Sequence, residues 1–548
     1  MMIDLEPNSG QGWTLSERRV WLVAGLLLAL HAILCWQGRE LAVLLMRDDA
    51  RYLILASSLA QGGYHDLFLS TGAAHSLYPP VFPALLLTWG SIIGESFDGY
   101  VAMNILLSAS ALALLFAGVK RIWGALIALL CLAPLCVNPL LIMRAGGLRA
   151  ETAYMFFSIA ALWALSRARP TTQALAVAVI AALLATLTRT VGITLIAAIA
   201  LLWLHQRRYR AVATLAVVSL ATVGAWIAWT VIAPQQHAGS NYIGDLVGAA
   251  VGEQPDWKAI LWRRTGVRLG RYFGPNLPWS LPMPTIPGTP IDNIVLSFAV
   301  LTGLLAGLLV LLKRWRVAGI YLVLYAGALM AYPFVRARFL EPVLPLLVTG
   351  FLLGAGALVA RVRPRWATPT IVILGLMLTV TGAVRSTPRI ARQMACGPID
   401  VENPPNCLSA QQSSFLRAVS YVSGNTDPND IFATKMPETL YYYTGRQSID
   451  TDLALTVNPA AFLDYLNEQG ADWALLTAGS RKFASMLWVH CEKLDVERSF
   501  NRRTVLFRIP SRAISGAERP GRDAAEACAA LDDFLSDYPR DAEGVAIE

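Results

Sequence analysis

The sequence predicts a polytopic α-helical membrane protein that carries a soluble α/β domain after its last apolar block. Hydrophobic residues make up 55% of the 548 residues and charged residues only 15%, whereas soluble domains carry about 25% charged residues. The apolar residues form blocks long enough to cross or nearly cross a bilayer, and they do not alternate as in an outer-membrane barrel. An excess of basic residues changes to an excess of acidic ones near residue 385. This change predicts a membrane domain over 1–385 and a soluble domain over 386–548.

The apolar blocks predict about 11 to 13 membrane spans. The clear blocks are 21–36, about 100–119, 122–142, 152–166, 173–187, 190–204, 211–233, 291–312, 317–334, 339–360 and 366–385. Basic residues gather at every second connection, at 120–121, 167–169, 207–210, 313–316 and 361–365. Short basic loops of membrane proteins face the cytoplasm. We therefore expect a cytoplasmic N-terminus, a tail outside the membrane, and no role for these charges in binding nucleic acid.

Two long loops, 37–99 and 234–290, are expected on the outer side. Within the first loop, residues 79–94 are apolar but short and rich in proline, so we expect a helix that lies in or dips into the interface. Within the second loop, 257–273 has the pattern of a basic amphipathic helix. Such a helix either binds the surface of anionic lipid or packs with a solvated basic face.

Four of the seven cysteines lie in the tail: Cys396, Cys407, Cys491 and Cys528. An even number in an outer segment favours disulfides over a zinc site, because no CxxC spacing is present. Four cysteines allow three pairings. One of them joins Cys396 to Cys407 and Cys491 to Cys528. The prediction is consistent with a periplasmic or extracellular tail.

The tail between about 410 and 510 has the pattern of a small α/β layer. Strands are predicted at 430–434, 473–477 and 503–509, and helical segments at 413–423, 439–443 and 460–469. After about 511 the sequence becomes polar, and we expect loose order towards the end. The chain contains no glycine loop of the kind that binds nucleotides.

Carboxylates at the expected outer edge of the membrane are candidates for chemistry. Asp48 and Asp49 follow an apolar run, and Glu151 opens a later span. A carboxylate there can act as a general base toward a hydroxyl group or hold a divalent cation. The structural alternatives are a solvated helix cap for the aspartates and compensation of the helix dipole for Glu151.

Arginines at the same edge are candidates for binding a phosphate. Arg189 lies between two apolar blocks, and Arg336 and Arg338 lie in the segment FVRARFLEP. A guanidinium group stays charged and binds phosphate through two hydrogen bonds. The alternative is that these side chains only extend to the interface.

Several short segments occur in the order found in one family of membrane enzymes. They are Asp48–Tyr52 (DDARY), Tyr78–Pro83 (YPPVFP), Glu151 ahead of the fourth span, Leu187–Gly192 (LTRTVG), Arg338–Pro342 with Pro345, and Ile431–Arg446. On these segments the chain resembles the glycosyltransferases of the GT-C fold, in particular the bacterial relatives of protein O-mannosyltransferases and lipid A aminoarabinose transferases. It differs in having Tyr78 where many relatives have lysine, and Met103-Asn104 where they often have arginine.

The resemblance implies an inverting transfer of a sugar from a polyprenyl-monophosphate donor to an acceptor on the outer face of the inner membrane. It implies that Asp48 is the base, and that Asp49 and Glu151 support it or hold a divalent cation. It also implies that Arg189, Arg336 and Arg338 contact the donor phosphate. Arg51, Tyr52 and Tyr78 belong to its motifs and are candidates for substrate binding.

Two other functions remain as alternatives. A lipid or glycan transporter (flippase) would place charged or broken helices near the middle of the bilayer and would contain inverted repeats. A non-catalytic scaffold would use the tail to bind a partner. The sequence specifies neither the sugar nor whether the acceptor is a lipid, a glycan or a protein.

Overall fold

The computed structural model describes residues 16–43, 47–167, 169–233, 266–284, 290–332, 335–397, 399–510 and 524–536. The chain forms two compact units. Unit 1 comprises the described residues of Met1–Glu40, Tyr78–Thr230 and Tyr242–Met394, and unit 2 those of Leu41–Leu77, Val231–Asn241 and Ala395–Glu548. Residues Leu41–Leu77 of the first long loop therefore belong to the same unit as the residues after Ala395. The predicted division at residue 385 placed this loop in the membrane domain.

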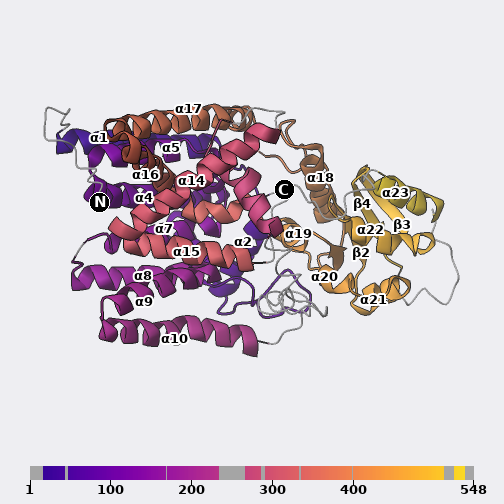
Figure 1. Cartoon of the computed structure of the whole chain (residues 1–548). Helices are drawn as coiled ribbons and strands as arrows, with labels where there is room; N and C mark the ends of the chain where they lie inside the picture. The colour runs from indigo at the N-terminus through magenta and orange to yellow at the C-terminus, as the bar shows by residue number, and fades with distance from the viewer. Residues whose placement is uncertain are drawn as a thin grey trace. The chain divides into compact units, whose positions relative to one another are not determined.

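Unit 1 is built from apolar helices, which Figure 1 shows from indigo to brown. They are α1 (Glu17–Gln37), α3 (Val81–Ile93), α4 (Phe97–Trp123), α5 (Ala125–Cys136), α6 (Pro139–Ala145), α7 (Ala150–Ala164), α8 (Thr172–Thr188), α9 (Ile193–His205), α10 (Tyr209–Ile232), α13 (Leu277–Ser280), α14 (Pro290–Arg314), α15 (Arg316–Ala331), α16 (Leu344–Val362) and α17 (Ala367–Met394). Short turns η1 (Thr190–Gly192), η2 (Tyr272–Asn276), η3 (Ala337–Val343) and η4 (Pro364–Trp366) link or extend them.

Length and composition identify six segments among the described residues as candidate membrane spans. They are Glu17–Gln37, Phe97–Trp123, Tyr209–Ile232, Ile294–Arg314, Ala337–Val362 and Pro364–Met394. The pair α5 and α6, which is bent by 63°, would make a seventh, and α3, α8, α15 and the segment Thr190–His205 are shorter apolar helices. The structure therefore supports a multi-pass membrane protein, and the count of 11 to 13 spans stays a prediction.

Large apolar side chains point outward from these helices. Leu220 of α10 is 75% exposed, and Phe298 of α14 and Val380 of α17 are more than half exposed. Contiguous exposed apolar surface is rare on a soluble protein, whereas the hydrocarbon core of a bilayer covers it. The exposed faces of α10, α14 and α17 are therefore the surfaces that contact lipid.

Helices α14 and α16 approach each other through paired glycines. Gly303 and Gly307 lie one turn apart on α14 and face Gly350 and Gly354 of α16. A Cβ atom at Gly307 would overlap the backbone carbonyl of Gly350. Small residues four apart allow this backbone contact, which is a common way for helices to associate in membranes.

Basic side chains mark one end of the helices of unit 1. Lys120 and Arg121 lie in the last turn of α4, Lys313 and Arg314 in that of α14, and Arg361 in that of α16. Glu17, which opens α1, forms an ion pair with Lys120. The first turns of α4 and α16 lie at the other end of these helices. Glu341, just ahead of α16, is found at that end.

Unit 2 contains a four-stranded sheet in the order β1-β2-β4-β3. The strands are β1 (Phe432–Thr434), β2 (Trp473–Leu476), β3 (Asp495–Asn501) and β4 (Thr504–Arg508); β1 and β2 are parallel, and the other two pairs are antiparallel. Strands β1, β2 and β4 confirm the three predicted strands. Strand β3 was not predicted, because its residues DVERSFN are polar and it forms a half-exposed edge.

The helices of unit 2 are α2 (Arg47–Ala60), α18 (Ala410–Asn425), α19 (Pro437–Thr444), α20 (Thr451–Ala454), α21 (Phe462–Glu468), α22 (Arg481–Trp488) and α23 (Ala524–Ser536), with the turns η5 (Pro459–Ala461) and η6 (Cys491–Lys493). Disulfides join Cys396 to Cys407 and Cys491 to Cys528. The second disulfide attaches α23 to η6, and α23 buries Leu531 and Phe534 in the hydrophobic core. This part of the polar C-terminal stretch is thus an ordered helix that composition alone did not predict.

We expect that the stability of unit 1 depends on the close contact between Gly307 of α14 and Gly350 of α16. Replacing Gly307 with alanine would force α14 and α16 apart, and overpacking of this kind costs about 1–3 kcal/mol. The matched control is Gly327→Ala on α15, where a Cβ meets no atom within 4 Å and alanine favours the helix by up to about 1 kcal/mol. Thermal unfolding in detergent should show a lower midpoint for G307A only, and equal midpoints for the two variants would contradict the packing argument.

Candidate functional site

A group of charged side chains in unit 1, here called the polar cluster, lies where several helices end or begin. Its members are Glu40, Arg144, Arg149, Glu151, Arg189 and Glu341. Glu40 follows α1, Arg144 lies in the last turn of α6, and Arg149 immediately precedes α7. Glu151 lies in the first turn of α7, Arg189 follows the last residue of α8, and Glu341 lies in η3. Helix ends far apart in the sequence thus share one charged region.

Glu151 and Arg189 form the first ion pair, with 2.9 Å between Oε1 and Nη1. Glu151 lies in the first turn of α7, where a negative charge also suits the helix dipole. Arg189 has an extended backbone that ends α8, and a Cβ at Gly192 would touch the backbone of Thr186. The sequence LTRTVG therefore reverses the chain tightly and brings the arginine to the carboxylate.

Glu341 is the second buried carboxylate and is 1% exposed. The hydroxyl of Thr152 donates to it over 3.2 Å. Its Oε2 lies 3.9 Å from Nε of Arg144, which is an ion pair but too long for a hydrogen bond. The hydroxyl of Tyr325 donates to the carbonyl of Phe339 over 2.7 Å, and this contact fixes η3 beside α15.

Arg149 and Glu40 form the third ion pair, since one Nη2 lies 2.9 and 3.1 Å from the two carboxylate oxygens. The buried amide of Asn104 donates to the carbonyls of Gly147 and Arg149 at 2.6 and 3.3 Å. A side chain at Gly147 would collide with the Glu40 carboxylate. Asn104 thus holds the turn that leads into α7.

Three further predicted residues of unit 1 are half-exposed: Tyr78, Arg336 and Arg338. The guanidinium carbon of Arg338 lies 5.4 Å from the centre of the Phe339 ring. Arg336 and Arg338 flank and open the same η3 segment that carries Glu341. The polar cluster plus these two arginines contains five arginines and three glutamates, an excess of two positive charges. Such an excess suits an anionic ligand.

The remaining predicted residues belong to unit 2 and lie on α2. Asp48 and Asp49 are both in its first turn. Asp48 is half-exposed, whereas Asp49 and Tyr52 are buried. Asp48 is therefore the carboxylate of this pair that a ligand can reach, and both acids suit the N-terminal end of the helix dipole.

Helix α19 holds α2 in place within unit 2. Arg51 forms an ion pair with Glu438 of α19, whose side chain is 0% exposed. The hydroxyl of Tyr443 donates to the carbonyl of Val43 over 2.6 Å, just ahead of α2. Burial raises the pKa of Tyr443, so this hydroxyl remains protonated as a donor. The C-terminal residues thus fix the helix that carries Asp48.

The first loop also extends the sheet of unit 2. Ser448 bridges in parallel to Phe432 of β1 on one side and to Leu69 of the loop on the other. The amide of Ser448 donates to Phe68, and its carbonyl accepts from the amide of Ser70, at 2.8 and 3.0 Å. The loop after α2 is therefore attached by backbone hydrogen bonds as well as by the Arg51–Glu438 pair.

The structure brings together two of the predicted site residues, Glu151 and Arg189, and adds Glu341, Arg144, Arg149 and Glu40 to them. Glu341 had a recognisable signal, because it is the only acidic residue between Asp292 and Asp400. Glu438 had none, since an acid in the first turn of a helix is common.

Among the described residues, no group of three or more His, Cys, Asp or Glu side chains could hold a metal ion. The predicted amphipathic helix at 257–273 lies largely outside the described residues.

Comparison with solved structures identifies the class of fold as that of the GT-C membrane glycosyltransferases. The chain is similar to ArnT from Cupriavidus metallidurans, in a crystal structure with bound undecaprenyl phosphate, at 13% identity and a TM-score of 0.56, covering 91% of this chain and 99% of that one. It is also similar to the oligosaccharyltransferase of Archaeoglobus fulgidus, in complex with Zn and sulfate, at 13% identity and a TM-score of 0.54, covering 84% of this chain and 69% of that one. No protein-family model and no curated protein matches the sequence. At this identity the likeness concerns the fold, and it confirms the fold that the resemblance implied.

We expect the Arg51–Glu438 pair to contribute strongly to the stability of unit 2. Arg51→Met removes the arginine from a buried ion pair, and removing one partner of such a pair costs about 3–5 kcal/mol. The double variant Arg51→Met/Glu438→Gln should recover part of that loss, because the buried negative charge is removed together with its arginine. Both would be measured by thermal unfolding of the purified protein.

The matched control is Arg39→Met. Arg39 pairs with Asp98, whose side chain is 51% exposed, and pairs of that kind contribute about 1 kcal/mol or less. A loss for R51M no larger than that for R39M would contradict a supporting role for the buried pair.

Proposed function

We propose that this protein is a membrane glycosyltransferase that transfers a sugar from a polyprenyl-monophosphate donor to an acceptor, with inversion at the anomeric carbon. The observation that supports the proposal most is the excess of two positive charges in the polar cluster, which includes Arg189, together with Arg336 and Arg338. The structurally similar ArnT carries undecaprenyl phosphate, an anionic polyprenyl lipid. The acceptor is a lipid, a glycan or a protein of the cell envelope.

The proposal includes a topology. The chain would cross a bacterial inner membrane 11 to 13 times with its N-terminus in the cytoplasm and its basic helix ends on that side. The polar cluster and the C-terminal residues would then face the periplasm. The disulfides Cys396–Cys407 and Cys491–Cys528 support this orientation, because disulfides persist in oxidising compartments.

In this proposal the arginines bind the donor phosphate. Arg189, Arg336 and Arg338 would contact its oxygens, and Glu151 and Glu341 would hold Arg189 and Arg144 in fixed positions. Fixed cations stabilise the phosphate as its charge increases on leaving. Tyr78 would lie beside the donor, while Arg51 and Tyr52 would contribute through α2.

Asp48 would supply the base. Its carboxylate accepts the proton of the acceptor hydroxyl, the oxygen attacks the anomeric carbon, and the bond to the phosphate oxygen breaks with its electron pair on the departing polyprenyl phosphate. Asp49 and Glu151 support this chemistry or bind a divalent cation. The partial exposure of Asp48 beside the buried Asp49 supports this division of roles.

The charges of unit 1 favour this enzyme over a transporter or flippase. Glu151, Arg189 and Glu341 lie at helix ends or in short turns, whereas transporters bind their substrates near the middle of the bilayer, at broken helices. A catalytic requirement for Asp48 is the property that separates the two functions.

We expect Asp48→Asn to abolish transfer while leaving the protein folded. Loss of a general base lowers the rate by about 10²–10⁴-fold. Purified protein would be incubated with a panel of polyprenyl-phosphate sugars and an envelope extract, and released polyprenyl phosphate would be quantified. The control is Asp98→Asn, an exposed acid of α4 paired with Arg39, which should retain activity. Full activity of D48N, or full complementation of a deletion strain by it, would contradict the enzyme and favour the transporter.

We also expect Arg336→Gln to weaken donor binding. The change halves the excess positive charge from two to one, and losing one charged phosphate contact should raise KM for the donor about ten-fold with a smaller effect on kcat. The control is Arg208→Gln in a basic loop outside the polar cluster. Equal KM values for the two variants would contradict a role for Arg336 at the phosphate.

A further inference from the structure

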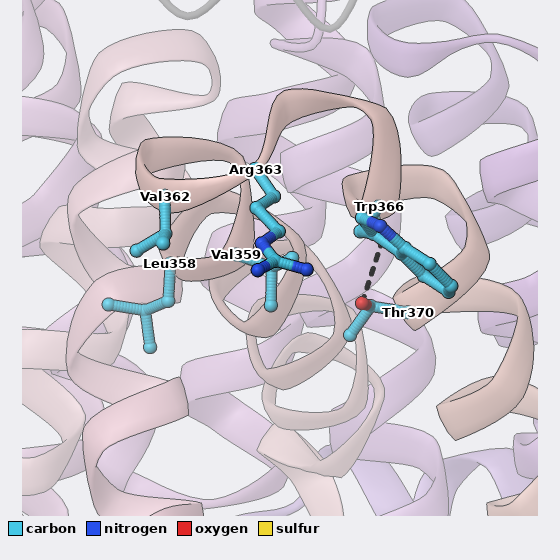
Figure 2. Close-up of a pocket in the computed structure, with 6 residues that line it drawn as sticks. All are labelled: Leu358, Val359, Val362, Arg363, Trp366 and Thr370. Atoms are coloured by element: carbon cyan, nitrogen blue, oxygen red, sulfur yellow. Dashed lines mark hydrogen bonds between the residues drawn. The ribbon is translucent and has the colours of Figure 1, made fainter.

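A surface groove lies at the far end of α16 from the polar cluster. Figure 2 shows its lining residues, Leu358, Val359, Val362, Arg363, Trp366 and Thr370, which come from the end of α16, from η4 and from the start of α17. The hydroxyl of Thr370 donates to the carbonyl of Trp366 over 2.8 Å and fixes the turn. The groove has a volume of about 510 Å³.

The groove is separate from the proposed reaction site. Glu341 immediately precedes α16, and Val362 is its last residue. A helix of 19 residues spans roughly 28 Å at 1.5 Å per residue. One end of α16 therefore adjoins the polar cluster, and the other end carries the groove.

The walls of the groove are apolar and open to the surroundings. Val362 is 82% exposed and Trp366 48% exposed, and Leu358 and Val359 are half-buried beside them. In Figure 2 the Arg363 side chain extends between the aliphatic residues and the indole. An amphipathic ligand with an apolar tail and a polar head fits this arrangement.

The charge at the groove is positive and is not balanced by neighbouring acids. Arg361, Arg363 and Arg365 are exposed, and the sequence has no Asp or Glu from 342 to 399. Within the described ranges, none of the three guanidinium groups makes an ion pair or a hydrogen bond. In the polar cluster, by contrast, each carboxylate has an arginine partner.

We propose that this groove binds an anionic phospholipid of the bilayer. The acyl chain lies along Leu358 and Val362, and the phosphate of the head group accepts hydrogen bonds from Arg363, with Trp366 at the level of the head groups. Guanidinium groups bind phosphate oxygens through two parallel hydrogen bonds, and interfacial tryptophan is typical of such sites. Basic residues near an anionic membrane surface are attracted to its lipid head groups. The site would attach the α16–α17 end of the protein to anionic lipid independently of sugar transfer.

Native mass spectrometry of the purified full chain tests the proposal. The protein in detergent would be titrated with palmitoyl-oleoyl phosphatidylglycerol or with the zwitterionic phosphatidylcholine of the same chains. We expect one phosphatidylglycerol bound at least ten-fold more tightly than phosphatidylcholine, and a ten-fold loss of that preference in Arg363→Gln and in Trp366→Ala. Soluble glycerol phosphate should not compete, because the apolar wall contributes to binding.

Arg208→Gln is the matched control, since it removes one half-exposed arginine from another basic loop. An equal loss of preference in R208Q and R363Q would overturn the proposal in favour of general surface attraction. Equal binding of the two lipids by the wild type would also overturn it, as would competition by glycerol phosphate. Circular dichroism of each variant shows that it remains folded, which is expected because Arg363 and Trp366 are exposed.

Discussion

The pairing of charges inside an apolar unit is the constraint on which the rest of unit 1 depends. Removing an ion from water costs several kcal/mol even after relaxation, and a partner must recover that cost. Glu40, Glu151 and Glu341 each have an arginine from a different part of the chain. These three pairs determine where α1, α6, α7, α8 and η3 must meet, and the close turn at Gly147 follows from that requirement.

A similar dependence links the two ends of the chain in unit 2. Arg51 and Glu438 are 387 residues apart, and Tyr443 and Val43 are 400 apart. The residues after 395 are therefore part of the structure that supports α2. The proposed role of Asp48 as a base requires that its carboxylate is held in a fixed position, and α19 supplies buried contacts that hold the helix of Asp48.

Much of this arrangement could be predicted from the sequence, because local chemistry determines it. The break at Arg189 follows from polar residues and glycine between two apolar blocks, and strands β1, β2 and β4 follow from short apolar runs between turns. Glu438 and Tyr443 could not be identified, since their importance comes from partners hundreds of residues away. Strand β3 and helix α23 were missed because the first is a polar edge and the second depends on a disulfide and a few buried side chains.

The two ends of α16 show how the same side chain acquires different roles. At one end, arginines face buried glutamates, and their positions are fixed by ion pairs in an apolar environment. At the other end, Arg361, Arg363 and Arg365 are exposed and the sequence nearby contains no acid. An exposed positive charge with no acid nearby is most stable beside anionic lipid, whereas an arginine paired with a buried glutamate is held in a fixed position. The distribution of acids, more than that of arginines, therefore distinguishes the proposed reaction site from the proposed lipid contact in this chain.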